Sequence, residues 1–239
     1  MEHNVTKHIA IIPARGGSKR IKRKNVIDFM GKPMIAWTIE AALNTGVFKK
    51  IIVSTDDEEI AEVSKDTGAL VPFLREAYAD DISPVSKATL DCLKNCEKIF
   101  SENYETVTQL MPNAPLRTHR DIMDHIDEFE SFQRESQISC FKFGWFNPWW
   151  AFSGSSDTKY EFIHKEKIKY RSQDLPPLFC PSGAIWISKC DHLKKHRSFY
   201  SSSTKYKELE IMSAVDIDDL EDLDMAKAFY LFRTQNNVT

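Results

Sequence analysis

Short apolar runs alternate along the chain with longer stretches in which apolar residues recur at helical spacing. The runs that have the length of buried strands lie at 8–14, 50–55, 69–74, 105–110 and 137–143. The stretches with helical periodicity lie between them, at 31–46, 56–68, 85–100 and 119–132. Strands that alternate with helices in this way form a mostly parallel sheet that helices cover on both faces. The pattern therefore predicts an α/β fold.

Local signals predict where the first two helices begin and end. Pro33 stands near the first turn of one helix, and Gly46 follows its last turn. In the next helix, Asp56 can cap the N-terminus and Glu59 can reach back toward the cap. Gly68 is suited to the left-handed residue that ends this helix.

The alternation breaks between residues 144 and 181. Aromatic residues, prolines and a Gly/Ser turn in this region predict an antiparallel excursion instead of another strand-helix-strand unit. The α/β pattern returns with a strand at 183–188, a weaker strand near 208–217 and a last helix at 219–232. We therefore predict a single domain, 1–239, in which residues 145–180 form an insertion.

Charge and cysteine content narrow the functional classes. The chain has 32 lysines and arginines against 35 aspartates and glutamates, a net charge of −3. This balance argues against a dedicated nucleic-acid binder or a protein of anionic membranes. No apolar stretch has the length of a membrane span, and we predict a cytoplasmic protein. The five cysteines are scattered and contain no CxxC pair, so neither a disulfide framework nor a zinc site is indicated.

The loop after the first predicted strand is unusually basic. It reads "ARGGSKRIKRKN" and lacks both the Rossmann glycine pattern and the P-loop pattern. In an open α/β sheet this loop leaves the edge at which ligands bind. Gly16 and Gly17 allow backbone N–H groups to approach an anion, and Arg15, Lys19 and Lys24 can neutralise a triphosphate and the departing pyrophosphate. A solvated basic loop without a ligand is the alternative.

Two aspartates near the other end of the chain supply complementary charge. Asp216 and Asp218 are separated by one residue, so in an extended segment their carboxylates point the same way. Mg²⁺ prefers one or two carboxylates together with phosphate oxygens and water. The alternative is that these aspartates cap the final helix and interact with its dipole.

Five blocks, in this order and spacing, resemble the acylneuraminate cytidylyltransferases, which make CMP-sialic acid and related CMP-nonulosonates. The blocks are "IIPARGGSKRIKRKN", "IIVSTDDEEIAEVSKDTGA", "MPNAPLRT", "RSQDLPPLFCPSGAIWI" and "VDIDDLEDL". The resemblance implies a Rossmann-like nucleotidyltransferase fold, CTP as a substrate and Mg²⁺ as a cofactor. It also implies a homodimer in which the excursion reaches over the partner's active site as a dimerisation element and sugar lid.

The same resemblance assigns roles to individual residues. It implies that Arg15 and Lys19 bind phosphate and take part in catalysis, and that Asp216 and Asp218 are catalytic metal ligands. The nucleotide-binding set that it implies is Arg15, Gly16, Gly17, Ser18, Lys19, Lys24, Asn25 and Arg75. For Arg75 a surface ion pair, and for Asn25 a turn, are the plain alternatives.

The sugar side departs from the sialic-acid pattern. Met111 stands where a glutamine is expected, and Trp186 replaces a tyrosine. The sugar-binding candidates are Met111, Asn113, Arg117, Trp150, Arg171, Gln173, Ser182 and Trp186. Of these, Arg171 or another cation is expected to hold the acceptor's carboxylate. The aromatic candidates have an alternative as core or dimer-interface residues, and Arg117 as a surface ion-pair residue.

The resemblance implies an enzyme that transfers CMP from CTP to the anomeric hydroxyl of a nine-carbon α-keto acid sugar and releases pyrophosphate. The more apolar sugar side predicts a legionaminic or pseudaminic acid rather than N-acetylneuraminic acid. Two other classes stay open at this point. A glycosyltransferase that consumes a nucleotide sugar could use the same aspartates, and a non-catalytic nucleotide-binding module could use the same loop.

Overall fold

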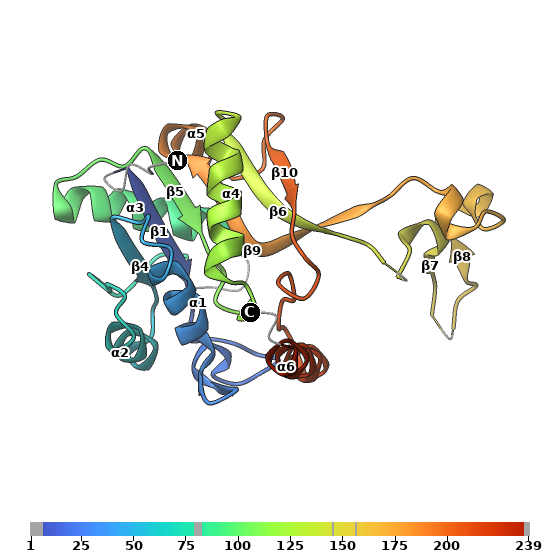
Figure 1. Ribbon diagram of the computed structural model, residues 1–239, viewed down its shortest axis with the longest axis horizontal. Helices are drawn as coiled ribbons and strands as arrows, with labels where there is room; N and C mark the ends of the chain where they lie inside the picture. The colour runs from blue at the N-terminus through green and yellow to red at the C-terminus, as the bar shows by residue number, and fades with distance from the viewer. Residues whose placement is uncertain (1–6, 79–82, 145, 156, 237–239) are drawn as a thin grey trace.

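The computed structural model describes residues 7–78, 83–144, 146–155 and 157–236, and a six-stranded sheet forms its centre (Figure 1). The strand order is β10-β6-β9-β5-β1-β4. The strands are β1 (His8–Pro13), β4 (Lys50–Ser54), β5 (Thr106–Gln109), β6 (Ser136–Lys142), β9 (Phe179–Lys189) and β10 (Lys205–Glu208). Only β9 runs antiparallel to its neighbours β5 and β6. The predicted α/β fold with a mostly parallel sheet is confirmed.

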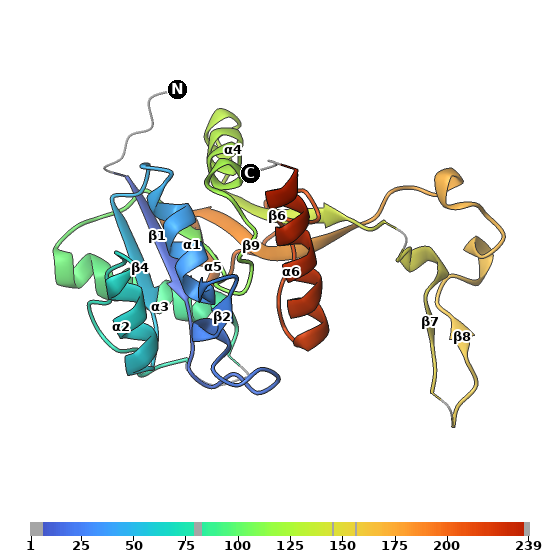
Figure 2. The same cartoon turned by 60° about the horizontal axis from the view of Figure 1, so that its bottom comes forward.

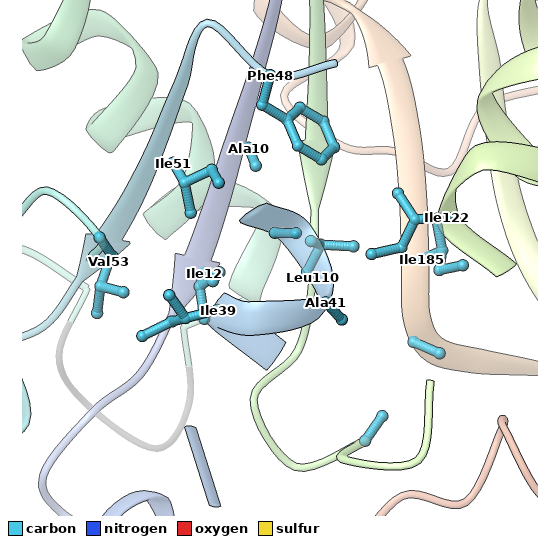
Figure 3. Close-up of a cluster of buried hydrophobic side chains, with 14 of the residues drawn as sticks. Ala10, Ile12, Ile39, Ala41, Phe48, Ile51, Val53, Leu110, Ile122 and Ile185 are labelled. Carbon is cyan, nitrogen blue, oxygen red and sulfur yellow. The ribbon is translucent and has the colours of Figure 1, made fainter. Parts of the chain in front are cut away.

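Helices cover both faces of this sheet. They are α1 (Met34–Leu43), α2 (Glu58–Asp66), α3 (Val85–Phe100), α4 (His119–Ser131), α5 (Cys190–His196) and α6 (Leu220–Gln235). Side chains of β1 alternate between the faces: Ile12 packs in a core with Ile39 of α1, whereas Ile11 packs in another core with Leu93 of α3 (Figure 3 shows the first). A strand with helices on both sides is apolar at successive positions, which explains the continuous run in β1.

The helix ends agree with the sequence at the C-termini and differ at one N-terminus. Gly46 and Gly68 have positive φ angles of 65° and 103°, as residues that end helices require. Asp57, not Asp56, caps α2, and its side chain accepts a hydrogen bond from the Ile60 N–H. The predicted cap is therefore wrong by one residue. The Asp56 carboxylate instead accepts a hydrogen bond from the Gly16 N–H.

Two predicted strands need correction. Residues 69–74 make only one bridge, in which Leu70 pairs with Ile52 beside β4. The strand expected near 208–217 instead lies earlier, at β10, and the chain turns after it. Period and composition locate such segments to within a few residues, whereas pairing partners decide where the ladder forms.

The excursion between β6 and β9 projects from the body as an arm, as Figures 1 and 2 show. It contains the short antiparallel pair β7 (Phe152–Ser153) and β8 (Glu161–Phe162), and this pairing confirms its predicted antiparallel character. Three 3-10 turns, η2 (Pro148–Trp150), η3 (Lys165–Lys167) and η4 (Ser172–Asp174), complete it. The first predicted residue of the insertion, Trp145, and both predicted domain limits lie outside the described residues.

The basic loop leads from β1 into a small ribbon that precedes α1. The ribbon consists of η1 (Lys24–Val26), β2 (Asp28–Phe29) and β3 (Lys32–Pro33). Phe29 contributes to a third core, in which it packs with Ile217 and with Leu223 of α6. This core joins the chain's first and last segments next to the carboxyl end of β1. Among the described helices, none is long and apolar enough to cross a bilayer.

Candidate active site

A cavity of about 530 Å³ opens beyond the carboxyl ends of β1 and β5. Residues from five separate segments line it: the basic loop, the region around Arg75, the start of α3, the segment after β5, and the segment before α6. The predicted residues among them are Arg15, Ser18, Lys19, Lys24, Asn25, Arg75, Met111, Asn113, Asp216 and Asp218. Open α/β sheets bind ligands at this edge, so the cavity is the candidate active site.

The start of α2 holds the basic loop in place. The Gly16 N–H donates to Asp56 Oδ1 at 2.9 Å. Arg23, in the left-handed conformation with φ of 59°, donates to both carboxylate oxygens of Asp57 and also pairs with Glu59. Gly16 and Gly17 are not among the residues that line the cavity. Their predicted contact with phosphate stays untested, and the observed role of Gly16 is to anchor the loop.

Asn25 fixes the other end of the loop. Its side chain is 5% exposed, and its Nδ2 donates to the Arg15 carbonyl oxygen at 2.9 Å. Asn25 is therefore more than a turn residue, because its side chain joins the end of the loop to the backbone of Arg15. This contact keeps Arg15 at the wall of the cavity without engaging the Arg15 side chain.

Asp218 is held by two cations. Lys24 Nζ lies 2.9 Å from Asp218 Oδ1, and an Arg20 guanidinium nitrogen lies 2.6 Å from Asp218 Oδ2. Lys24 also donates to the Ile217 carbonyl oxygen at 2.8 Å. Burial raises the pKa of Asp218, but the hydrogen bonds and charges of Lys24 and Arg20 outweigh this effect and lower the pKa below its usual value. Asp218 is therefore ionised at neutral pH.

Asp216 has a contrasting environment. The crowded wall of the cavity surrounds its carboxylate, which still faces the opening, and no hydrogen bond or ion pair joins it to another described residue. Burial, with the neighbouring negative charge of Asp218, raises the pKa of Asp216 to about 6. Lys24 and Arg20 act on Asp216 only through their charges, whereas both contact Asp218 directly.

The two aspartates do not cap the last helix. Asp219 is the N-cap of α6 and forms a capping box with Asp222, whose Oδ2 also accepts from the Asp218 N–H at 2.9 Å. The alternative that Asp216 and Asp218 cap this helix is therefore wrong, because Asp219 is the cap. Both carboxylates remain directed to the cavity.

The pair fits a magnesium ion that shares its coordination with phosphate. Asp216 offers a carboxylate without a hydrogen-bond partner, and Asp218 lies beside it on the same wall. Within the described part of the chain, no group of three or more histidine, cysteine or acidic side chains could hold a metal ion by itself. Phosphate oxygens and water would have to complete the shell, which is the coordination that Mg²⁺ favours.

Arg75 is a buried cation at the cavity wall. Its side chain is 3% exposed, its backbone N–H donates to the Thr55 carbonyl oxygen at 2.7 Å, and a terminal nitrogen lies 4.0 Å from Asp56. Burial is the main cause of the lowered pKa of Arg75. The alternative of a surface ion pair is wrong for this residue. A buried guanidinium with a distant counter-ion is suited to an anionic or hydrogen-bond-accepting ligand.

The sugar-side candidates divide into two groups. Met111 and Asn113 line the cavity, and the Asn113 amide donates to the Ile217 carbonyl oxygen at 3.3 Å. Arg117 is 2% exposed and donates to the carbonyl oxygens of Met111 and Ala184 at 3.2 and 2.6 Å. Arg117 is not among the residues that line the cavity, and its Nε and Nη2 are buried without a hydrogen-bond partner among the described residues, so its contact with the sugar stays a prediction. The surface ion-pair alternative is wrong, because the residue is buried.

Ser182 and Trp186 also lie in the protein interior. Ser182 is hydrogen-bonded to Ser139, and Trp186 donates its indole N–H to the Ser182 carbonyl oxygen at 2.7 Å. The Trp186 ring packs against Phe199 and Tyr200 with centroids 5.5 and 5.3 Å apart. The core alternative therefore describes Trp186 correctly, and neither side chain is among the residues that line the cavity.

The remaining sugar-side candidates are on the arm. Trp150 belongs to η2, Gln173 to η4, and Arg171 pairs with Asp174 at 2.8 Å. None of the three is among the lining residues of this chain's cavity. A role for them in sugar binding would require the arm to reach another cavity.

The geometry agrees with a comparison of the whole sequence. The sequence model of the family described as "Cytidylyltransferase" matches residues 9–238. The chain belongs to the cytidylyltransferase family. The prediction of a CTP-dependent nucleotidyltransferase is thereby confirmed at the level of the family, and the alternatives of a glycosyltransferase and a non-catalytic module are not retained.

Relatives within this cytidylyltransferase family act on nonulosonic acids by name. A pseudaminic acid cytidylyltransferase of Campylobacter jejuni is 36% identical over 234 residues, which are 94% of this chain and 96% of that protein. A CMP-N,N'-diacetyllegionaminic acid synthase of Legionella pneumophila is 35% identical, with 88% and 90% covered. An N-acylneuraminate cytidylyltransferase of Streptococcus agalactiae is 34% identical, with 90% of this chain but 51% of that protein covered. The resemblance to the acylneuraminate cytidylyltransferases is confirmed.

A solved structure supports the nucleotidyltransferase fold. A CMP:2-keto-3-deoxy-manno-octonic acid synthetase complexed with CTP superposes with a TM-score of 0.69 at 17% identity, and the match covers 95% of this chain and 99% of that one. At this identity the likeness concerns the fold alone. It agrees with the α/β fold of the cytidylyltransferase.

Sequence reasoning missed several lining residues of this cytidylyltransferase. Arg20 lines the cavity and contacts Asp218 directly, but the sequence predicts a site role only for other cations of the same basic loop. Tyr78, Ser83 and Val85 approach the cavity from the segment before α3 and from its start. Arg20 could have been found from the charge run, whereas the others carry no local signal because only the fold brings them to the site.

Proposed function

We propose that this cytidylyltransferase transfers CMP from CTP to the anomeric hydroxyl of a nine-carbon α-keto acid sugar and releases pyrophosphate. The observation that carries the proposal is the single cavity in which Arg15 and Lys19 of the first loop meet Asp216 and Asp218 of the last segment. Cations that bind a triphosphate and carboxylates that bind its metal belong together in nucleotidyl transfer. The named acceptors of the relatives supply the sugar class.

The reaction forms one bond and breaks another at the α-phosphorus. The anomeric oxygen attacks this phosphorus in line, the bond to the oxygen that bridges the α- and β-phosphates breaks, and the hydroxyl proton passes to one of the two aspartates, Asp216 or Asp218, or to water. Arg15 and Lys19 would bind the departing pyrophosphate and stabilise its growing charge. Arg75, buried at the cavity wall, would bind the nucleoside portion or the α-phosphate.

Asp216 and Asp218 are the residues that would hold Mg²⁺. The ion, when bound, offsets negative charge on the phosphates and orients them for in-line attack. Asp218 would bring a fully ionised carboxylate to this site, and Asp216 one whose pKa of about 6 leaves it mostly ionised at neutral pH. The support is the geometry of the pair at the cavity wall.

For the acceptor, we propose an acid of the pseudaminic or legionaminic type. The support is the identity and near-complete coverage of the relatives with these names, together with the apolar side chain of Met111 at the cavity. Trp150 and Trp186 no longer contribute to this argument, because neither lines this chain's cavity. An apolar contact discriminates between sugars by only about 1 to 3 kcal/mol, so we expect a preference and not exclusion.

We further propose a homodimer built on the arm, in a cytoplasmic enzyme where CTP is at hand. Apolar arm side chains are exposed in the single chain, among them Phe146 (72%), Phe152 (56%) and Ile163 (61%). Such a patch is typical of a protein interface. Seated on a second copy, the arm would bring Trp150, Arg171 and Gln173 toward the partner's cavity.

A pyrophosphate-release assay tests the activity. Purified protein with Mg²⁺ is given CTP, ATP, GTP or UTP, each with and without pseudaminic, N,N'-diacetyllegionaminic or N-acetylneuraminic acid. We expect release only with CTP and an acceptor, with kcat/KM about ten- to a few hundredfold higher for the first two acids. Equal turnover with ATP or GTP would contradict cytidylyl transfer. Equal or better kcat/KM for N-acetylneuraminic acid would overturn the acceptor proposal alone.

A further inference from the structure

Arg20 and Asp218 form an ion pair inside the candidate active site that nothing in the chemistry of the reaction requires. The guanidinium nitrogen and Asp218 Oδ2 are 2.6 Å apart, and Arg20 lines the cavity together with Arg15 and Lys19. Arg20 therefore neutralises one of the two carboxylates that would hold the metal. The pair places a cation of the protein at an oxygen that a metal ion would need.

The two cations on Asp218 differ in how firmly they are held. The Lys24 side chain is 14% exposed, and its Nζ donates both to Asp218 and to the Ile217 carbonyl oxygen. The Arg20 side chain is 63% exposed and makes its contact at the cavity's solvent side. A buried lysine with two acceptors is a fixed part of the site. An exposed arginine with one acceptor can leave at little cost, because exposed ion pairs contribute little free energy.

The charges in the cavity favour Arg20 on Asp218 before a triphosphate binds and favour its release afterwards. Arg20 and Lys24 both contact Asp218 directly, and a divalent cation on both carboxylates would meet the positive charge of Arg20. A triphosphate reverses this balance, because it brings several negative charges to the same cavity. Arg20 can then exchange a carboxylate for a phosphate, since its guanidinium binds either group through similar hydrogen bonds.

We propose that Arg20 is an exchangeable counter-ion that occupies Asp218 until a nucleoside triphosphate arrives and then turns to its phosphates, so that metal and nucleotide bind cooperatively. This inference rests on the proposed function, because it takes Asp216 and Asp218 as the metal-holding pair. In thermodynamic terms, Arg20 weakens metal binding to the nucleotide-free protein and strengthens the coupling between metal and triphosphate. That coupling is reciprocal, so the metal also strengthens nucleotide binding.

Direct binding of Mn²⁺ tests the proposal without any transfer reaction. Free Mn²⁺ is followed by electron paramagnetic resonance in titrations of the wild type and of Arg20→Ala, with and without the non-transferable analogue α,β-methylene-CTP. For the nucleotide-free protein we expect Arg20→Ala to bind Mn²⁺ about threefold to tenfold more tightly, a range consistent with an exposed ion pair. We expect the analogue to increase Mn²⁺ affinity by a smaller factor in Arg20→Ala than in the wild type.

Two further variants separate this effect from a general change of charge. Lys22→Ala removes the same charge from the same loop at an exposed residue outside the lining of the cavity, and it should stay within twofold of the wild type. Arg20→Lys retains the charge and should restore affinities toward those of the wild type. Thermal unfolding of each variant verifies that the loop substitutions leave the protein folded.

Three results would overturn the proposal. One is Mn²⁺ binding by nucleotide-free Arg20→Ala that is equal to or weaker than that of the wild type, undetectable binding included. Another is an equal change in Lys22→Ala, and the third is an analogue effect that is undiminished in Arg20→Ala. Failure of the proposed function has a different signature, because it would appear as absent pyrophosphate release with every acceptor, whatever the Mn²⁺ affinities.

Discussion

Gly16 and Asp57 approach so closely that only glycine fits at residue 16. A Cβ atom built on Gly16 would lie 2.6 Å from Asp57 Oδ2 and 2.9 Å from the Asp57 Cβ. Asp57 at the same time caps α2 and receives hydrogen bonds from Arg23. The glycine therefore lets the basic loop pack on the start of α2, where Asp56 accepts its N–H.

Gly16→Ala should consequently loosen this packing. We expect a loss of stability of about 1 to 3 kcal/mol, because Asp57 must move away from its cap and from Arg23. Urea unfolding measures the loss, and Gly17→Ala is the matched control, since a Cβ there would meet nothing within 4 Å. The control should change stability by less than about 0.5 kcal/mol. Equal stability of the two variants would contradict the packing argument.

Removing one carboxylate from the metal-holding pair should impair the chemical step. For Asp216→Asn or Asp218→Asn we expect kcat to fall about 100-fold or more, with partial recovery at high Mg²⁺, because a transition-state contact is lost. Asp219→Asn is the neighbouring control, since asparagine caps a helix as well as aspartate does. Near wild-type kcat in both Asp216→Asn and Asp218→Asn would contradict their proposed role as metal ligands.

Arg15→Ala provides the contrast within the same assay. A phosphate clamp acts in the ground state and in the transition state, so the KM for CTP should rise as kcat falls. Loss of kcat alone, without weaker CTP binding, would place Arg15 away from the triphosphate.

Substitutions of Arg117 and Arg171 should have different effects, because we expect Arg117 to stabilise the fold and Arg171 to bind the sugar. Arg117→Met should cost about 2 to 4 kcal/mol in urea unfolding, because it removes the guanidinium donor from the carbonyl oxygens of Met111 and Ala184. Arg171→Ala should leave stability unchanged, since its pair with Asp174 is exposed, and should raise the acceptor's KM. A stable Arg117→Met with a raised acceptor KM would instead restore the original sugar-binding prediction.

Removal of the arm should produce a monomer. Replacement of residues 145–180 by a short Gly/Ser linker deletes the exposed aromatic side chains and the first two residues of β9, while the rest of β9 stays paired with β5 and β6. We expect sedimentation analysis to show a dimer for the full chain and an inactive monomer for the deletion. A stable, fully active monomer of the full chain would refute the dimer proposal.

His125 should make stability depend on pH. Burial, opposed by its bond to the Asp121 carbonyl oxygen, is the main cause that lowers the pKa of His125 to about 4 from 6.5. The unfolded chain therefore binds a proton between these pH values while the folded chain does not, so stability is full above pH 6.5 and falls as pH decreases toward 4. The His125 contribution to this loss is about 3 kcal/mol. Urea unfolding from pH 7.5 to 4.5 should show that His125→Gln lacks this contribution, and parallel pH profiles would contradict it.

The sequence by itself determined the layers of the fold and two charged groups of the site, the cations of the basic loop and the aspartate pair near the other end. Apolar runs such as β1 must be buried on both faces, and their alternation with amphipathic helices leaves few arrangements other than a covered, mostly parallel sheet. Arg15 and Lys19 follow β1 directly, so the position of that strand fixed theirs. The spacing of Asp216 and Asp218 likewise required no knowledge of distant segments.

Only the tertiary structure decided which polar side chains are free to meet a ligand. Arg117 appears in the sequence as an available cation, yet it is buried and one of its terminal nitrogens donates to the carbonyl oxygens of Met111 and Ala184. Arg20 appears as one more basic loop residue, yet the fold brings Asp218 to it from the other end of the sequence. A side chain's hydrogen-bonding partners come from segments far away in the chain, and local sequence patterns do not specify them.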